Sequence, residues 1–128
     1  MLEKNLSIEF KHAIEKIKPK TTTVYELKMV KTRRFALGVV QSHQVEGLQE
    51  AKEGLWYKLA DMSSMTGYGM KKPFDAIWIK VDEAYVVPIF WTPRVRKTAY
   101  LIPIEEFVKF KTTSVLEEEL LKFESIDL

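Results

Sequence analysis

The sequence predicts one domain of the mixed α/β (α+β) class. Hydrophobic residues make up 46% and charged residues 30% of the 128 residues, which is the composition of a globule with a single core. Apolar residues recur at helical spacing in some segments and alternate as in strands in others, and the sequence has no internal repeat. We therefore expect a single domain over residues 1–128, in which helices flank a mixed central sheet. Residues 112–128 are expected to form an acidic helical tail.

The first two elements are predicted to be a helix and a strand. Residues 5–18 place Leu6, Phe10 and Ile17 on one helical face. Residues 21–30, TTTVYELKMV, are rich in β-branched side chains and contain neither Gly nor Pro, which favours a strand.

A connection over residues 31–41 then leads to a second predicted helix. Ser42 can cap this helix, which should run to Glu53, and Gly54 is suited to end it. Residues 55–59, LWYKL, are expected to form a short strand.

The following segment is expected to be a loop and then a hairpin. Residues 61–72 contain the Gly, Ser and Met residues of a loop, and residues 74–81 and 84–91 are expected to pair with each other across Asp82-Glu83. Pro88 indicates an edge position or a bulge for the second strand, because proline cannot donate a hydrogen bond to a neighbour. Residues 98–103 are expected to form another strand.

The C-terminal part is expected to be helical. Residues 104–110 can form a short helix, and Ser114 with Glu117 has the spacing of a capping box before a helix over residues 115–123. The apolar residues of that helix, Val115, Leu116 and Leu120, offer a surface for a partner chain.

Three tryptophans fall in strand patterns and are expected in the core. They are Trp56, Trp78 and Trp91.

The composition excludes several functional classes. Cysteine is absent, which excludes disulfides, thiolate metal sites and a cysteine nucleophile, and two histidines are too few for a His-rich zinc site. No apolar run is long enough to span a membrane, and residues 1–12 carry charges where a signal peptide needs an apolar stretch. We therefore expect a cytoplasmic protein without a membrane partner.

Charge is unevenly distributed along the chain. Residues 1–100 hold 17 Lys and Arg against 11 Asp and Glu, whereas residues 101–128 hold 3 against 7. A basic body with an acidic tail is compatible with a polyanionic partner such as DNA.

Glu26 and Lys28 are the first candidate site residues. In a strand they project from the same face, while Leu27 points to the opposite one. A carboxylate can hold a hard divalent cation, and an ammonium can stabilise the charge that develops on phosphorus during phosphodiester hydrolysis. The alternative is an ion pair on a solvated strand.

Three further polar residues are candidates. Asp75 precedes a strand, where it can be either a metal ligand or a turn former. Gln44, next to His43 at a helix start, can orient a water or contact a phosphate, or it can be an ordinary first-turn residue. Glu9 in the first helix can add a carboxylate to a metal site, or it can be a solvated helix residue.

Basic and aromatic residues flank these candidates, where they could neutralise phosphates and stack on a base. The expected DNA-binding residues are Lys31, Arg33, Arg34, Tyr68, Lys71, Lys72, Arg94, Arg96 and Lys97.

Together these segments resemble the PD-(D/E)XK nuclease superfamily, and within it the Holliday junction resolvase and RecU-type (penicillin-binding protein-related factor A) branch. The resemblance covers most of residues 5–107, and its motifs are NLSIEF (5–10), VYELKMV (24–30), RRFALGVVQSHQVEGLQEA (33–51), KKPFDAIWIKVDEAYVV (71–87) and KTAYLIPIEEF (97–107).

The resemblance implies a restriction-endonuclease-like core and a Mg²⁺- or Mn²⁺-dependent endonuclease for branched or junction DNA. Asp75 and Glu26 would hold the metal with Glu9 as a helper, Lys28 would position the attacking water, and Gln44 would support that water or a phosphate. It also implies 5′-phosphate products and a homodimer whose two sites cut two strands. The alternative is a catalytically inactive DNA-binding module of the same fold.

The motif order departs from that of the family, in which the Pro-Phe-Asp strand precedes the Glu-x-Lys strand and pairs with it. Here Asp75 follows both Glu26 and Gln44. Three arrangements remain open. The strand order is permuted and still places Asp75 beside Glu26, or strand exchange between two subunits completes the site, or the catalytic site is broken and the protein only binds.

Overall fold

A four-stranded mixed sheet forms the centre of the protein. The computed structural model describes residues 3–17, 21–60 and 72–128. The strands follow the order β1-β5-β6-β8, in which β1 and β5 are parallel and the other neighbours are antiparallel. This confirms the mixed α and β class with a mixed central sheet. The strands are β1 (Thr23–Val30), β5 (Glu83–Thr92), β6 (Arg96–Pro103) and β8 (Glu124–Asp127).

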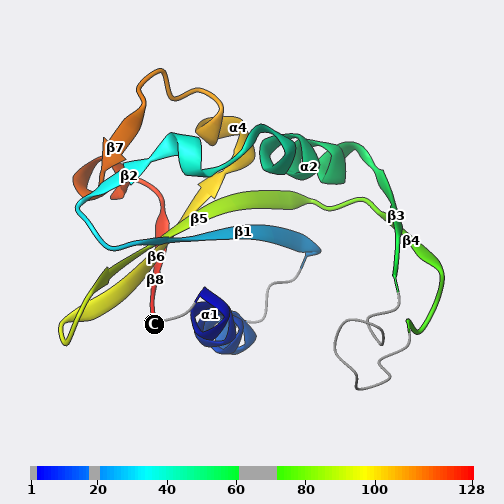
Figure 1. The fold of residues 1–128 in the computed structure, drawn as a ribbon, viewed down its shortest axis with the longest axis horizontal. Coiled ribbons are helices and arrows are strands. Elements are labelled where there is room, and N and C mark those ends of the chain that lie inside the picture. Colours follow the sequence, from blue (N-terminus) through cyan, green and yellow to red (C-terminus); the bar gives the residue numbers. More distant parts are fainter. Residues whose placement is uncertain (1–2, 18–20, 61–71) are drawn as a thin grey trace.

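Two layers cover the faces of this sheet (Figure 1). One face is covered by a single helix, and the other by helices and a small antiparallel sheet made of β2 and β7. The first layer is α1 (Glu3–Ile17), and the second comprises β2 (Arg34–Ala36), η1 (Leu37–Val39), α2 (Ser42–Glu53), α4 (Ile104–Phe107), β7 (Ser114–Leu116) and η2 (Glu117–Leu120).

The two sides of the sheet form two apolar clusters because side chains alternate along each strand. Tyr25 and Leu27 of β1 pack with Leu6 and Phe10 on the α1 side. Val30 packs in the other cluster, on the α2 side. Glu26 and Lys28, with the same parity as Val30, therefore belong to the α2 side, and Leu27 points away from them as predicted.

A separate two-stranded sheet projects from the end of the main sheet (Figure 1). It consists of β3 (Leu55–Lys58) and β4 (Ala76–Ile79), which pair antiparallel with Trp56 opposite Trp78. We call this unit the β3–β4 hairpin.

The predicted helices and strands in the first half of the chain are confirmed, with small differences. α2 runs from Ser42 to Glu53 and ends at Gly54, but its N-cap residue is Gln41 and Ser42 is already helical. Ile17 is 51% exposed, so the buried stripe of α1 ends before it. The predicted loop over 61–72 lies almost entirely outside the described residues.

The predicted hairpin of residues 74–81 and 84–91 is wrong. β4 pairs with β3, whereas β5 pairs with β1 and β6. Pro88 is neither at an edge nor in a bulge: it is buried in an inner strand, and the β5–β6 pairing keeps one register on both sides of it. Its missing N–H falls where no β5–β6 pair is formed.

The predicted helical tail is also wrong. Residues 112–128 contain β7, the one-turn η2 and β8, because β7 pairs with β2 and β8 with β6. Val115 and Leu120 are 1% and 0% exposed in the protein's own core, so they offer no surface to a partner. Trp56 and Trp78, expected in the core, are 61% and 62% exposed.

No helix in the described ranges is long and apolar enough to cross a membrane.

Candidate active site

Glu26, Lys28 and Gln44 meet on the α2 side of the central sheet. The Glu26 carboxylate oxygen Oε1 accepts a hydrogen bond from Gln44 Nε2 at 2.9 Å and lies 3.5 Å from Lys28 Nζ. The Glu26 and Lys28 side chains are 28% and 19% exposed, so the pair is partly shielded but still reachable from solvent. We call these three residues the Glu26 cluster.

The start of α2 fixes the orientation of the Gln44 amide. Its Oε1 accepts the backbone N–H of Gln41 at 3.0 Å, which leaves Nε2 to donate to Glu26. A flipped amide would direct an oxygen at the carboxylate and an NH₂ at a backbone N–H, which would be two unfavourable contacts. Gln44 therefore holds the Glu26 carboxylate in one position while it also closes the first turn of the helix.

The Glu26 cluster supplies a single carboxylate. Both contacts of Glu26 within the described residues use Oε1. No group of three or more Asp, Glu, His or Cys side chains with metal-binding geometry occurs in residues 3–17, 21–60 and 72–128. This donor set fits Mg²⁺ or Mn²⁺ that takes its other ligands from water and a substrate phosphate, and it does not form a complete protein cage.

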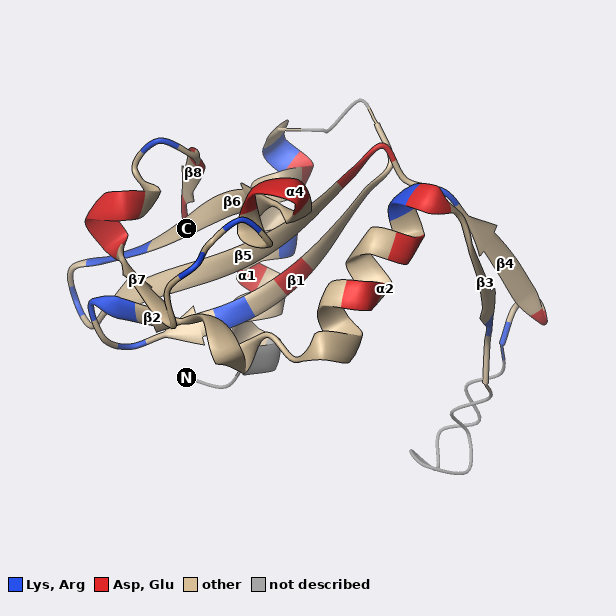
Figure 2. Cartoon of the chain, turned by 90° about the horizontal axis from the view of Figure 1, so that it is seen from above, with Lys and Arg blue, Asp and Glu red and all other residues tan. Residues whose placement is uncertain are grey.

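Asp75 is not brought to the Glu26 cluster within one chain. It directly precedes β4 at the far end of the β3–β4 hairpin, since Leu55 pairs with Ile79 at the near end. Its carboxylate is 92% exposed and lies 3.3 Å from Lys72 Nζ. The hairpin projects away from the sheet in two perpendicular views (Figures 1 and 2). A metal shared by Asp75 and Glu26 is therefore not formed inside a single copy.

Glu9 lies on the opposite side of the sheet, because α1 packs on the face that carries Leu27. Its carboxylate accepts two hydrogen bonds from Lys97 Nζ, at 2.8 and 2.9 Å. The prediction that Glu9 adds a ligand to the Glu26 site is wrong, since the sheet separates the two carboxylates.

The predicted DNA-binding residues that the structure describes divide into two groups, those that form ion pairs with carboxylates of the chain and four others. Arg33 and Arg94 are exposed, Lys31 stands 5.7 Å from the ring centre of Trp91, and Arg34 Nη1 donates to Ser114 Oγ at 3.0 Å. The others form ion pairs: Arg96 with Glu117, Lys97 with Glu9, and Lys72 with Asp75. Tyr68 and Lys71 lie outside the described residues.

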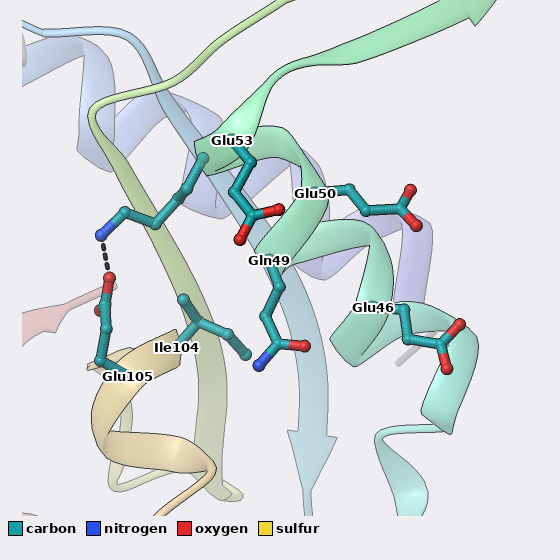
Figure 3. A pocket seen from close by; sticks show the side chains of 7 residues that line it. Glu46, Gln49, Glu50, Glu53, Ile104 and Glu105 are labelled. Carbon is teal, nitrogen blue, oxygen red and sulfur yellow. Dashed lines mark hydrogen bonds and ion pairs between the residues drawn. The ribbon is translucent and has the colours of Figure 1, made fainter.

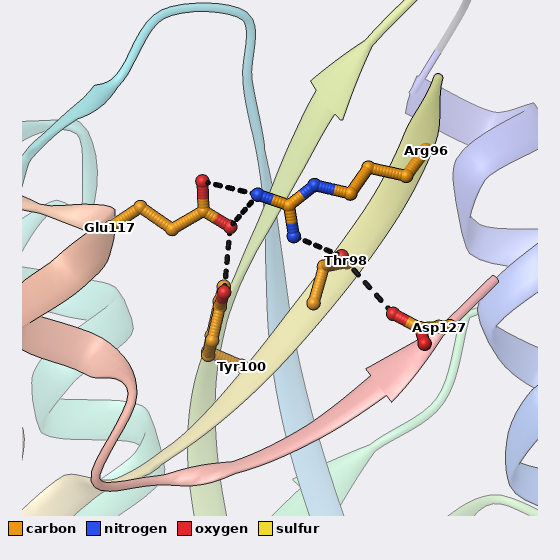
Figure 4. Close-up of polar contacts among 5 residues, drawn as sticks. All are labelled: Arg96, Thr98, Tyr100, Glu117 and Asp127. Atoms are coloured by element: carbon orange, nitrogen blue, oxygen red, sulfur yellow. Dashed lines mark hydrogen bonds and ion pairs between the residues drawn. The ribbon is translucent and has the colours of Figure 1, made fainter. Parts of the chain in front are cut away.

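A polar network that the sequence did not predict ties β6 to the C-terminal segment (Figure 4). Glu117 accepts hydrogen bonds from Arg96 Nη2 at 3.0 Å and from the Tyr100 hydroxyl at 2.6 Å. Arg96 Nη1 also donates to Thr98 Oγ1 at 3.1 Å. Alternation along β6 places Arg96, Thr98 and Tyr100 on one face, but no pattern in the sequence assigns Glu117 to them. This network engages Arg96 within the protein.

The outer surface of α2 is acidic (Figure 2). Glu46, Glu50 and Glu53 line a hollow of about 480 Å³ together with Glu105 of α4, which pairs with Lys52 (Figure 3). This surface repels phosphate. A second hollow, of about 540 Å³, is lined by three cations, Lys31, Arg33 and Arg96, beside Trp91, and also by the carboxylates of Glu117 and Glu118. It is therefore less acidic than the first hollow, although Glu117 pairs with Arg96.

No protein-family model, curated protein or solved structure matches this chain.

Proposed function

We propose that the chain is a metal-dependent DNA endonuclease with a restriction-endonuclease-like core, acting on branched DNA such as a four-way junction. The observation that carries the proposal is the Glu26 cluster, in which one carboxylate oxygen contacts both Gln44 Nε2 and Lys28 Nζ. A carboxylate, an ammonium and an amide from two elements thus meet on one accessible face. The resemblance to PD-(D/E)XK nucleases supplies the expectation that DNA is the substrate.

Each group has a separate task in the proposed reaction. A bound Mg²⁺ or Mn²⁺ would supply Lewis-acid stabilisation and a more acidic water. Glu26 would hold that cation, Lys28 would stabilise charge on the phosphate oxygens, and Gln44 would act as a positioning residue for Glu26. A water oxygen attacks phosphorus as the P–O3′ bond breaks. The water loses a proton to solvent and the 3′ oxygen gains one, which leaves 5′-phosphate and 3′-hydroxyl ends.

The cations after β1 would contact the DNA backbone. Lys31 follows Lys28 by three residues, or roughly 10 Å along an extended chain. Arg33 is exposed next to it, and both line the hollow beside Trp91. The acidic surface of α2, formed by Glu46, Glu50 and Glu53, would repel DNA from the side of the helix that faces α4. In this proposal a homodimer presents two such sites to the two strands that are cut.

A DNA-binding module without catalysis is the second candidate. The position of Asp75 favours it, because the single chain then offers one carboxylate at the Glu26 cluster. A second carboxylate would have to come from another copy of the chain. This candidate predicts salt-sensitive binding through Lys31, Arg33, Arg34 and Arg94 without hydrolysis.

Cleavage of a labelled four-way junction, compared with plain duplex, tests both candidates in Mg²⁺ and in Mn²⁺. Glu26→Gln and Lys28→Met are expected to lower the single-turnover rate about 100-fold or more, the loss typical of a removed transition-state contact. Glu15→Gln, which changes a 55% exposed carboxylate on α1, is the matched control and should cut like the wild type.

Each outcome decides between the candidates. An intact junction that still binds the wild-type protein in a salt-dependent way rejects the nuclease and supports the module. A junction that is neither cut nor bound rejects both. Cleavage that Glu26→Gln leaves unchanged places the chemistry elsewhere.

A further inference from the structure

The hollow at the end of β1 holds charges of both signs. Its volume is about 540 Å³, and it lies where β1 and β5 end, β6 begins and η2 passes. Three cations and two carboxylates line it, so most of its positive charge is offset within the protein. These charged residues are Lys31, Arg33, Arg96, Glu117 and Glu118. We call this site the mixed-charge hollow.

Arg96 is already bound to Glu117 in the mixed-charge hollow (Figure 4). Arg96 Nη2 lies 3.0 Å from each of the two carboxylate oxygens of Glu117, and Arg96 Nη1 donates to Thr98 Oγ1 at 3.1 Å. A guanidinium uses the same N–H donors for a carboxylate and for a phosphate, so the two anions compete for it. A phosphate that enters the hollow therefore meets an arginine whose donors are engaged.

Glu117 is the fixed member of this pair. Its carboxylate accepts the Tyr100 hydroxyl at 2.6 Å, and its backbone N–H donates to the Arg33 carbonyl at 3.2 Å. Tyr100 is 2% exposed and the Glu117 side chain 19%, whereas the Arg96 side chain is 51% exposed. The carboxylate is therefore held by the core, and the guanidinium reaches it from the solvent side.

Arg33 is a second arginine in the same hollow with a different environment. It is exposed, and its side chain forms no hydrogen bond or ion pair within residues 3–17, 21–60 and 72–128. The backbone contact with Glu117 places it directly beside the Arg96 pair. Of these two neighbouring arginines, one is open to a phosphate and the other is occupied.

We propose that Glu117 takes the place of a DNA phosphate at Arg96 and keeps this cation out of the contact with DNA. The inference rests on the proposed function in one respect, that DNA is the polyanion. Sequence-independent binding grows with the number of phosphates that cations neutralise, so masking Arg96 weakens binding to any duplex. Specificity depends on the ratio of specific to non-specific affinity, which this autoinhibitory contact raises.

The salt dependence of binding to a labelled plain duplex tests the masking of Arg96. The slope of log K against log salt concentration changes by about 0.9 for each phosphate contact. Arg33→Gln should make the slope shallower by that amount, whereas Arg96→Gln should leave it unchanged. The two variants are matched, because each removes one exposed arginine from the same hollow.

Glu117→Gln removes the competing charge and keeps an acceptor for the Tyr100 hydroxyl. This variant should steepen the slope by about 0.9, which corresponds to about 5-fold tighter binding at about 0.15 M salt. Combining it with Arg96→Gln should restore the wild-type slope. Glu119→Gln is the matched control, since it removes the same charge from an exposed residue of η2 that does not line the hollow.

Two outcomes overturn this proposal without bearing on cleavage at the Glu26 cluster. One is an Arg96→Gln slope that falls as much as the Arg33→Gln slope, because Arg96 then already contacts DNA. The other is a folded Glu117→Gln variant that shifts no more than Glu119→Gln. The arginine pair decides the question even if Glu117→Gln does not fold. If neither the wild type nor any variant binds a duplex or a junction, the proposed function fails together with this inference.

Discussion

Replacing Gly54 by alanine tests how α2 is connected to the β3–β4 hairpin. Gly54 ends α2 with φ 123° and ψ 124°, a backbone conformation that L residues rarely adopt. An added Cβ would also lie 2.5 Å from Trp78 Cζ2. The backbone conformation therefore favours glycine here, and a Cβ would in addition displace the Trp78 ring.

The loss of stability follows from two effects, the backbone strain at position 54 and the contact of the added Cβ with Trp78. A non-glycine residue forced into a disfavoured region costs about 1–3 kcal/mol. Trp78 is 62% exposed, so its ring can move aside and loses only its contact with the Gly54 backbone. We expect Gly54→Ala to lower the free energy of unfolding by about 2–3 kcal/mol, because backbone strain dominates. For a domain of this size each kcal/mol corresponds to roughly 3–5 °C in Tm.

Gly47→Ala is the matched control within the same helix. No atom lies within 4 Å of a Cβ added at Gly47, and its φ is not positive. Alanine in a helix interior is favoured over glycine by about 1 kcal/mol, so this variant should be more stable than the wild type. Urea and thermal unfolding measure both variants. A Gly54→Ala protein as stable as the wild type, or two variants that change in the same direction, would refute the reasoning.

Two further predictions concern pH and an ion pair. Burial and the hydrogen bond to Glu83 raise the pKa of Tyr85, so the fold favours the neutral phenol. The free energy of unfolding should be insensitive to Tyr85 below about pH 10 and should fall above it, by at most about 1.4 kcal/mol per pH unit for one tyrosine. Tyr85→Phe should make this fall shallower in urea unfolding at pH 8 to 11, and an unchanged slope would contradict the assignment. Glu9→Gln and Lys97→Met should be coupled by about 1 kcal/mol in a double-mutant cycle, because the pair is partly buried and forms two hydrogen bonds. Additive effects would show that the pair contributes nothing.

The Glu26 cluster could be predicted from the sequence to the extent that it depends on local geometry. Alternation along β1 is enough to place Glu26 and Lys28 on one face, and Gln44 was expected near a helix start. Their contact depends on α2 packing over β1. Local periodicity does not predict which helix packs on which strand, so this contact could be expected only from the resemblance to a known family.

Long-range pairing is where the prediction failed. The Asp82-Glu83 pair looked like the turn of a hairpin, but β5 is buried between β1 and β6, and β4 pairs with β3. The local alternation in residues 74–81 is the same for either pairing, so it could not place Asp75. The Ser114 and Glu117 spacing likewise favoured a helix, and the pairing of β7 with β2 outweighed it.

Paramagnetic broadening by Mn²⁺ of the amide signals of the wild-type chain bound to junction DNA tests the central claim most directly. If Glu26 holds the metal, the amides of Glu26, Lys28 and Gln44 should lose intensity at the lowest Mn²⁺ concentrations, and Glu26→Gln should abolish that loss. Broadening that begins instead at the acidic hollow of Glu46 and Glu50, or that is unchanged in Glu26→Gln, would contradict the account.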